Sequence, residues 1–305
     1  MKSNPGLVYA FLAYGFWGGL PIYLKFFDRV PAVEVLCHRV IWSAVLLIVV
    51  LAVQKRLREL QKLWRSPRFL AILLLTALLL SCNWGIFIYG VNSDRVVECS
   101  LGYFINPLFS VLLGFIFLKE RLNLWQVLAV VLAALGVGNF ILDFGQVPWL
   151  AFALAVSFGL YGLLRKITVV PPMTGLAVET LLMTPIALAF TGHWAIAGSG
   201  SFGTTGLLSI LFIGCGVVTS LPLLWFANAA RRLQLSTLGL MQYIAPSLQL
   251  ICGVFLYQEP FTRTHLISFS LIWIALAIYS GNSLITKKKT TPAFSKKEKP
   301  ITNNQ

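Results

Sequence analysis

Long apolar stretches alternate with short basic segments along this chain. Stretches without Asp, Glu, Lys or Arg run 3–24, 69–93, 99–118, 122–142, 144–164, 180–230, 233–258 and 264–286. Each is long enough to cross a bilayer, which takes about 20 apolar residues in a helix. The pattern therefore predicts an all-α, polytopic membrane protein.

The stretches predict about ten transmembrane helices. The stretch 180–230 must hold two crossings, and its small, polar run at 192–206 is expected to be the loop between them. A further span, about 31–53, is apolar apart from Glu34 near its start and Arg39 further in. Including it brings the expected number to ten.

Charge indicates orientation. The composition is 58% hydrophobic and only 11% charged, which excludes an ordinary soluble domain. The net charge of +14 would suggest nucleic acid, but the basic residues lie between and after the apolar stretches. Most of the 24 Lys and Arg residues fall on one side, which predicts a bacterial inner-membrane protein with both termini cytoplasmic. The basic tail, 286–305, is expected to be disordered.

An internal repeat divides the apolar part of the chain. Pro107, Gly114 and Glu120 are spaced like Pro246, Gly253 and Glu259, and VP at 30–31 matches VP at 170–171. We expect two copies, 6–143 and 144–285, each with five transmembrane helices. Because five is odd, the second copy must be inverted relative to the first, which is typical of transporters with a midplane substrate site.

Four motifs together carry a resemblance to a known family. They are CHRVIWS at 37–43, NWGIFIYGVN at 83–92, ECSLGYFINPL at 98–108 and STLGLMQYIAP at 236–246. In these the chain resembles the EamA transporter family of the drug/metabolite transporter superfamily. The resemblance implies a ten-helix inner-membrane permease, and some members of the family are linked by name to chloramphenicol.

Two charged residues inside spans are candidates for function. Arg39 and Glu179 occupy matching repeat positions, and ionisable groups at membrane depth are costly. Arg39 would hold an anionic or carbonyl-bearing substrate, and Glu179 would also serve proton coupling. The alternative is structural: Arg39 reaches outward or pairs with Glu34 or Glu98, and Glu179 turns toward Arg165 or Lys166.

Polar and aromatic residues at membrane depth complete the candidate substrate site. They are Asn83, Trp84, Tyr103, Asn106, Gln242 and Tyr243, with Trp17 and Tyr161 on the first spans of the two copies. Individually such residues are often interhelical hydrogen-bond partners or interfacial aromatics. Prolines within spans, among them Pro21 and Pro246, also point to a cavity, since each frees a backbone carbonyl four residues earlier.

The chemistry favours transport over catalysis. The sequence has no HExxH, GxxxxGK[ST] or GxSxG motif, so we expect no enzyme activity, no metal and no cofactor. The predicted function is a secondary transporter of small organic molecules, with drug or metabolite efflux by alternating access. The expected partners are a small-molecule substrate and membrane lipids, without nucleic acid, and a homodimer is left open. The alternative is a non-transporting membrane protein that binds a partner or lipid.

Overall fold

The computed structural model describes residues 5–119, 123–144, 147–168, 170–230, 232 and 241–290, and its regular secondary structure is helical. The first half contains α1 (Pro5–Gly18), α2 (Leu20–Leu24), the 3-10 helix η1 (Lys25–Phe27), α3 (Ala32–Val53), α4 (Leu57–Trp64), α5 (Pro67–Asn92), α6 (Val96–Leu118) and α7 (Leu124–Phe144). The second half contains α8 (Trp149–Ile167), α9 (Pro172–Ala197), α10 (Gly206–Ala230), α12 (Ile244–Ile251), the π-helical turn η2 (Cys252–Leu256) and α13 (Arg263–Thr290).

Six of the helices, α3, α5, α6, α7, α9 and α10, are long and apolar enough to cross a membrane. The pair formed by α1 and the segment Leu20–Phe27 meets the same criterion although it is bent by 42°. Shorter apolar helices occur at Trp149–Arg165, Ile244–Leu256 and Arg263–Ile278. The chain is therefore a multi-pass helical membrane protein, as the hydrophobic pattern predicts.

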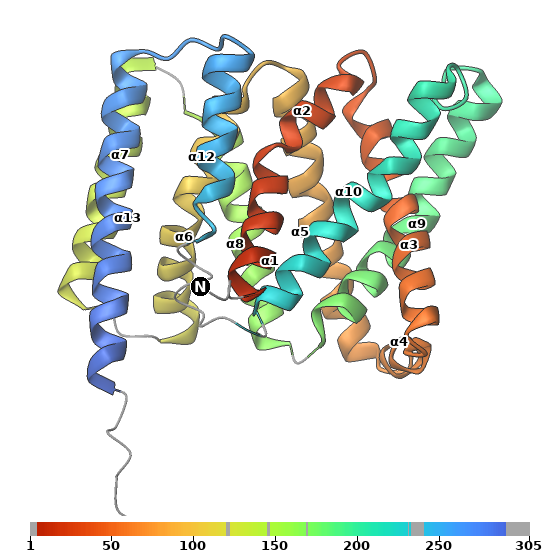
Figure 1. Cartoon of the computed structure of the whole chain (residues 1–305), viewed down its shortest axis with the longest axis horizontal. Helices are drawn as coiled ribbons and strands as arrows, with labels where there is room; N and C mark the ends of the chain where they lie inside the picture. Colours follow the sequence, from red (N-terminus) through yellow and green to blue (C-terminus); the bar gives the residue numbers. More distant parts are fainter. Residues whose placement is uncertain are drawn as a thin grey trace, which may run out of the picture.

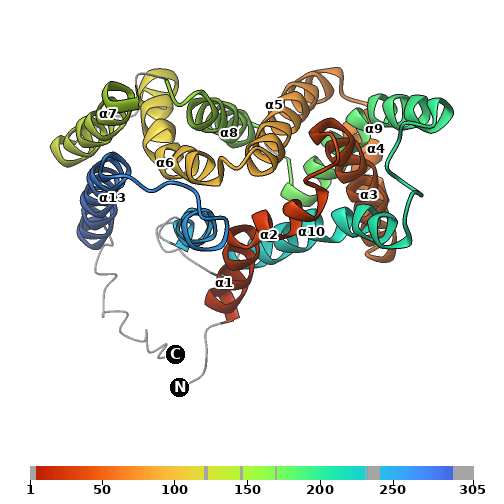
Figure 2. The same ribbon diagram turned by 90° about the horizontal axis from the view of Figure 1, so that it is seen from above.

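The helices stand side by side in an elongated bundle. Helices α7 and α13 pack together at one end, and α3, α9 and α10 gather at the other (Figures 1 and 2). Between them, α1 packs on α10 and α12, and α8 packs on α5 and α6. The short helix α4 lies at one face of the bundle and α2 near the opposite face (Figure 1), which we name the α4 face and the α2 face.

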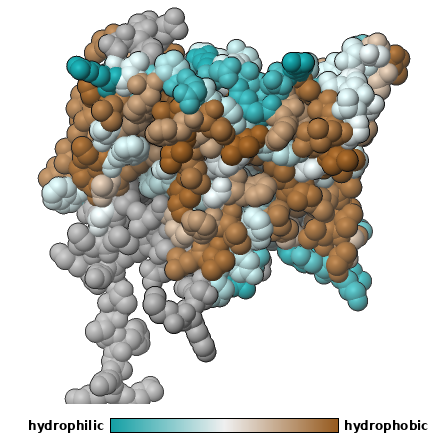
Figure 3. Space-filling view, turned by 45° about the horizontal axis from the view of Figure 1, so that its top comes forward, coloured by the Kyte–Doolittle hydropathy of each residue, from teal (hydrophilic) through white to brown (hydrophobic). Residues whose placement is uncertain are grey.

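The flank of the bundle is apolar. Figure 3 shows hydrophobic side chains over the side of the molecule and hydrophilic ones gathered toward the α2 face and the α4 face. Leu142 and Ile196 are 87% and 91% exposed, and Phe11, Leu207, Ile210 and Phe255 are also exposed. Such a surface matches lipid chains, because contiguous apolar patches of this extent are rare on soluble proteins.

Two boundaries differ from the sequence prediction. Helix α9 continues to Ala197, so the first part of the expected loop 192–206 is helical, and Gly198 in the left-handed conformation (φ +64°) ends the helix. Helix α13 is described to Thr290, so it continues into the first residues of the segment 286–305 that was expected to be disordered. The rest of the tail, 291–305, lies outside the described residues.

The small residues of α7 have different surroundings. A side chain at Gly136 would lie 2.9 Å from the Ser268 carbonyl of α13, so this glycine allows close packing within the chain. Asn139 adds a hydrogen bond from Nδ2 to Ser268 Oγ at 3.1 Å. Gly138 has no atom within 4 Å of where its side chain would be. Gly136 thus serves contact within one chain.

Helix α4 is tied to the second half of the chain through Glu59. The Arg56 guanidinium donates to both carboxylate oxygens of Glu59, at 2.7 and 2.9 Å, and Thr174 Oγ1 in the first turn of α9 donates at 2.6 Å. These hydrogen bonds, that from Arg56 foremost, lower the pKa of Glu59 to about 2. The carboxylate therefore joins α4 to α9 only while it is ionised.

We predict that Glu59→Gln lowers the melting temperature in detergent by about 1–3 °C at pH 7, since the pair is partly exposed. A depressed folded-state pKa stabilises the fold above the ordinary value of 4.5, and this contribution is lost as the pH falls toward 2. The difference between the two proteins should therefore shrink below about pH 4.5. Thermal unfolding followed from pH 7 to pH 3 measures it.

The matched control is Asp28→Asn, because Asp28 is an exposed acid in a connecting segment. This variant should melt like the native protein across the whole range. A Glu59→Gln protein as stable as the native one at pH 7 would contradict the assignment of Glu59 as a link between α4 and α9.

Candidate functional site

A cavity of about 430 Å³ lies inside the bundle. Its wall takes residues from α1, α2, α3, α5, α6, α8, α9, α10 and α12, and is mainly apolar. The volume is within the range of about 300–1,000 Å³ that is usual for small-molecule sites. The candidate residues on this wall are Trp17, Arg39, Asn83, Trp84, Tyr103, Tyr161 and Gln242. Seven of the sequence candidates thus meet in one cavity although they come from both halves.

Three of the sequence candidates are buried or partly buried away from the cavity wall. Glu179 and Asn106 are 1% and 2% exposed and are not among the residues that line the cavity. Tyr243 stacks on Phe104 of α6 with ring centroids 6.4 Å apart. Glu179 and Tyr243 contact neighbouring helices, as interhelical packing residues do, whereas Asn106 Oδ1 is buried without a hydrogen-bond partner among the described residues.

Arg39 is buried on α3, 5% exposed, and lines the cavity. Its Nε donates to Thr219 Oγ1 of α10 at 2.8 Å, and its guanidinium lies over the Trp84 ring at 4.3 Å from the centroid. A cation over an indole face is stabilised by the ring quadrupole. Nη1 is buried without a hydrogen-bond partner among the described residues. The guanidinium therefore keeps a free donor inside the protein.

The contacts expected for a structural Arg39 do not occur among the described residues. The side chain does not reach outward, because it is buried, and both carboxylates considered for it are bound elsewhere. Glu34 accepts from the Ser201 backbone N–H and hydroxyl at 2.5 and 2.8 Å. Glu98 accepts from Arg95 Nε at 2.9 Å and from the Leu150 N–H at 3.0 Å. The connection between α9 and α10 holds Glu34, and the first turn of α8 together with Arg95 holds Glu98.

Glu179 lies in a polar cluster between α5, α8 and α9. Thr76 Oγ1 donates to one carboxylate oxygen at 2.7 Å, Tyr161 OH lies 3.4 Å from the other, and Arg165 Nη1 forms an ion pair at 3.6 Å. The expected structural partner, Arg165, is therefore confirmed. Tyr161 and Arg165 line the cavity, so Glu179 reaches the cavity through these two side chains.

Asn83 links three helices beside the cavity. Its Nδ2 donates to the Leu154 carbonyl at 3.0 Å and to Ser157 Oγ at 2.9 Å, both on α8. Tyr103 of α6 donates to Asn83 Oδ1 at 3.3 Å. These contacts use both ends of the amide, so Asn83 and Tyr103 set the spacing of α5, α6 and α8.

The break between α1 and α2 is satisfied by a side chain from the other half. Pro21 cannot donate to the Trp17 carbonyl four residues earlier, and Gln249 Nε2 of α12 donates to that carbonyl at 3.1 Å. A side chain at Gly18 would meet Leu248 at 2.6 Å, so glycine allows α12 to approach the break. The prolines that the sequence singled out thus include one whose freed carbonyl joins the two halves.

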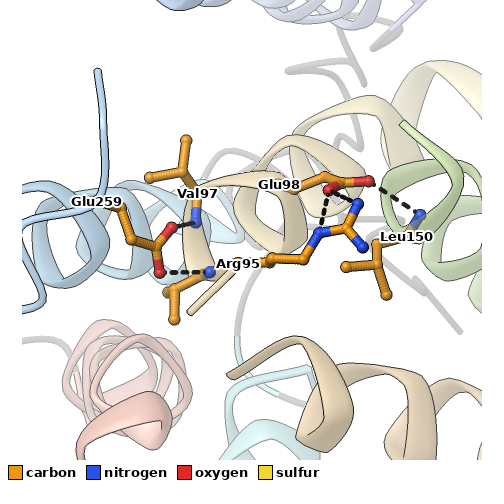
Figure 4. Close-up of polar contacts among 6 residues, drawn as sticks. Arg95, Val97, Glu98, Leu150 and Glu259 are labelled. Atoms are coloured by element: carbon orange, nitrogen blue, oxygen red, sulfur yellow. Dashed lines mark hydrogen bonds and ion pairs between the residues drawn. The ribbon is translucent and has the colours of Figure 1, made fainter. Parts of the chain in front are cut away.

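Carboxylates close the α2 face between the halves. Glu259, after η2, accepts from the backbone N–H groups of Val96 and Val97 at 2.7 and 2.8 Å, at the start of α6 (Figure 4). Figure 4 also shows Glu98 between Arg95 and the first turn of α8. Helix N-termini leave N–H groups without partners and carry partial positive charge, so a carboxylate is stabilised there. Glu120, the repeat equivalent of Glu259, lies outside the described residues.

Sequence reasoning missed several wall residues. Thr219 and Ser220 line the cavity from α10, and Arg165 lines it from α8. Thr and Ser within apolar spans usually bond to their own helix, so neither was distinguishable by spacing. Arg165 directly follows a long apolar stretch, so its position in the sequence indicated only how the chain is oriented in the membrane. In the structure Thr219 accepts from Arg39 and Arg165 pairs with Glu179.

Comparison with known proteins gives the family. The EamA-like transporter family matches residues 4–141 and again 147–281. An uncharacterised transporter of Vibrio cholerae is 48% identical, with 92% of this chain and 94% of that protein covered. Protein RarD of Salmonella typhi is 42% identical, with 94% and 98% covered. The chloramphenicol-sensitive protein RarD of Pseudomonas aeruginosa is 28% identical, with 92% and 95% covered.

A solved crystal structure shares the fold. It superimposes with a TM-score of 0.59 at 18% identity, covering 95% of this chain and the whole of that one. The helices and the internal cavity define a polytopic membrane protein built around a small-molecule-sized site. This chain belongs to the EamA-like transporter family, within the drug/metabolite transporter superfamily, and is similar to RarD proteins over nearly its full length.

We predict that Gly175→Ala separates Arg165 from Glu179. A side chain at Gly175 would lie 2.1 Å from Arg165 Nη1, so the flexible guanidinium must move off α9. A buried carboxylate that loses its counter-charge destabilises a fold by several kcal/mol. The melting temperature of Gly175→Ala in detergent should therefore fall. Arg165→Met should lower the melting temperature of the native protein by more than it lowers that of Gly175→Ala.

The control for this prediction is Gly192→Ala on the same helix. No atom lies within 4 Å of its added methyl group, so this variant should melt at or slightly above the native temperature. Fully additive losses in the Gly175→Ala, Arg165→Met cycle would contradict the contact.

We predict that Glu259→Ala speeds amide hydrogen exchange at Val96 and Val97 about fivefold or more, because their N–H groups lose their acceptor. Exchange at Leu150 should stay unchanged. Glu98→Ala should speed exchange at Leu150 and leave Val96 and Val97 unchanged, since Glu98 accepts from the Leu150 N–H. Mass-spectrometric exchange measures both sites in one sample, and unchanged exchange at the start of α6 in Glu259→Ala would overturn the cap.

Proposed function

We propose that this protein is a secondary transporter that moves small organic molecules across the bacterial inner membrane by alternating access. The observation that carries the proposal is the cavity between the two halves, whose wall holds the buried Arg39 with a free donor. Membership of the EamA-like transporter family supports it. Binding of a solute at this place, deep in the bundle, is the arrangement that transport by rocking halves requires.

The proposal includes ten crossings in two inverted copies, 6–143 and 144–285. The six long helices, the bent α1 pair and the three shorter apolar helices supply the crossings. The contacts support a two-fold relation between the copies. The contact between α1 and α10 corresponds to the contact between α8 and α5. The contact between α6 and α8 corresponds to that between α12 and α1. The contact between α3 and α10 corresponds to that between α9 and α5.

Local geometry supports the same relation. Pro31 and Pro171, the matched VP positions, each cap the N-terminus of a long helix, α3 and α9, with similar backbone angles. Lys119 and Gln258, which stand 139 residues apart in the repeat frame, both have φ of 55°. The matched positions of the two copies therefore share local geometry.

In this proposal the α4 face is cytoplasmic, as are both termini. The basic residues of 55–68 lie on and around α4, and basic connections favour the cytoplasmic side. The cavity wall continues to Val170 and Pro172 in the connection between α8 and α9, toward the α4 face. The Glu259 cap closes the opposite face. The structure thus resembles a state in which the site communicates with the cytoplasm.

The cargo is proposed to be a drug or metabolite that the cell exports. One relative is named for chloramphenicol sensitivity, which makes chloramphenicol the first compound to test. We also propose proton coupling through Glu179, because its carboxylate is buried at membrane depth and bonded to two residues of the cavity wall. The remaining candidates, Asn106 and Tyr243, are proposed to support the site from the neighbouring helices.

The direct test is flux into proteoliposomes of purified protein, with labelled chloramphenicol and a panel of metabolites, with and without an imposed proton gradient. We expect gradient-dependent movement of at least one compound. Absence of flux for every compound, with folding verified, would favour a membrane protein that binds a partner or lipid without transport.

We predict that Glu179→Gln keeps downhill exchange of the transported compound but loses the response to the proton gradient, because the amide cannot take up a proton. Exchange and gradient-driven accumulation are measured in the same vesicles. Asp28→Asn, in an exposed connection, is the control and should keep both. Gradient-driven accumulation that persists in Glu179→Gln would rule out coupling through this residue.

A further inference from the structure

The charges on the cavity wall are unbalanced. Among the described residues that line it, the charged ones are Arg39 and Arg165, and carboxylates do not occur. Arg165 has its counter-charge in Glu179 at 3.6 Å. The hydrogen bond from Arg39 goes to the neutral hydroxyl of Thr219. One uncompensated positive charge therefore remains in the cavity, at Arg39.

The surroundings of Arg39 do not neutralise it. The ionisable groups that act on it most strongly are Cys215, Tyr103 and Tyr23, a thiol and two phenols, which are ordinarily neutral at pH 7. A buried cation without a counter-ion is costly in an apolar bundle, and the cost falls when an anion enters. The site therefore favours a ligand that brings one negative charge.

Two buried hydrogen-bonding groups on residues of the cavity wall lack a partner. Arg39 Nη1 lacks a partner among the described residues. Ser220 Oγ, next to Thr219 in the chain and also on the cavity wall, lacks one too. A guanidinium edge together with a hydroxyl suits the two oxygens of a carboxylate, since charge-assisted hydrogen bonds to carboxylates are strong and directional.

The rest of the wall suits a flat apolar body. Trp84 lies under the guanidinium, and Trp17, Tyr103, Phe158 and Tyr161 add aromatic faces. Aromatic rings pack edge-to-face or offset against one another, so these faces favour an aromatic ligand over a flexible chain. The volume of about 430 Å³ admits one small molecule of this shape.

We propose that the cavity binds aromatic organic monoanions, with the ligand carboxylate on Arg39 and Ser220 and its ring between the wall aromatics. This inference rests on the proposed function and names the substrate class of the same site. An amine would meet an unneutralised cation and no carboxylate on the described wall. A dianion would need a second free cation, and Arg165 is already paired with Glu179.

The test compares three ligands of one shape and different charge: indole-3-acetate, indole-3-acetamide and tryptamine. Each is titrated against the purified full-length protein in detergent by calorimetry. We expect indole-3-acetate to bind at least about tenfold more tightly than the amide, and tryptamine to bind more weakly still. Equal or tighter binding of the amide or the amine, or no binding of any of the three, would overturn the proposal.

Variants then assign the anion to its residue. Arg39→Gln should weaken indole-3-acetate binding about tenfold or more while leaving the amide nearly unchanged, and Ser220→Ala should weaken it less. The control is Arg29→Gln, which removes the same charge at an exposed position outside the cavity and should bind like the native protein. Arg39→Lys keeps the charge and should retain part of the preference, so it separates loss of charge from loss of folding. An Arg39→Gln protein that binds the anion as tightly as the native one would overturn the assignment.

Flux measurements keep this proposal separate from the proposed function. Vesicles that transport chloramphenicol or a cationic metabolite, but neither bind nor move indole-3-acetate, would overturn the substrate class and leave the transporter assignment in place. Absence of flux for every compound would count against transport itself. Specific, Arg39-dependent binding of the anion would still support the ligand class in that case.

Discussion

Polar groups inside this bundle must find partners within the protein, because the surrounding hydrocarbon offers none. That constraint explains most of the contacts beside the cavity. The amide of Asn83 is fully engaged between α6 and α8, and the Trp17 carbonyl freed by Pro21 is taken by Gln249 from the other half. Glu179 is surrounded by a threonine, a tyrosine and an arginine. Several buried polar atoms of the described residues still lack a hydrogen-bond partner, and among these Arg39 Nη1 belongs to a charged group on the cavity wall without a counter-ion, which indicates a place for a ligand.

The same constraint explains how the two halves are held together. Their contacts combine apolar helix packing with a few carboxylates placed on helix N-termini, as Glu259 is on α6 and Glu98 on α8 (Figure 4). Such caps are worth about 1 kcal/mol each, far less than the burial of the apolar helices. A closure made of contacts of this size can open without unfolding either half, which alternating access requires.

Much of the architecture follows from hydrophobicity alone, because lipid forces long apolar segments into helices. Spacing also led to Arg39, Trp84, Tyr103 and Gln242, which the structure brings to one cavity. It did not lead to Thr219 or Ser220, since a hydroxyl in an apolar helix gives the same signal whether it bonds to its own turn or to a neighbour. Nor could it show that Glu34 is bound by Ser201 and Glu98 by Arg95 and the start of α8, which leaves Arg39 without a carboxylate, because that depends on how distant segments meet.

The central claim is that one cavity is reached in turn from both faces of the membrane. It is tested by a single cysteine at Leu224 on the cavity wall, in a background with all five native cysteines changed to serine. A membrane-impermeant maleimide is added to right-side-out and to inside-out vesicles. The account predicts labelling from both sides, faster from the α4 face, with Glu259→Ala accelerating labelling from the α2 face alone. Labelling from one face only, unchanged by Glu259→Ala, would contradict it.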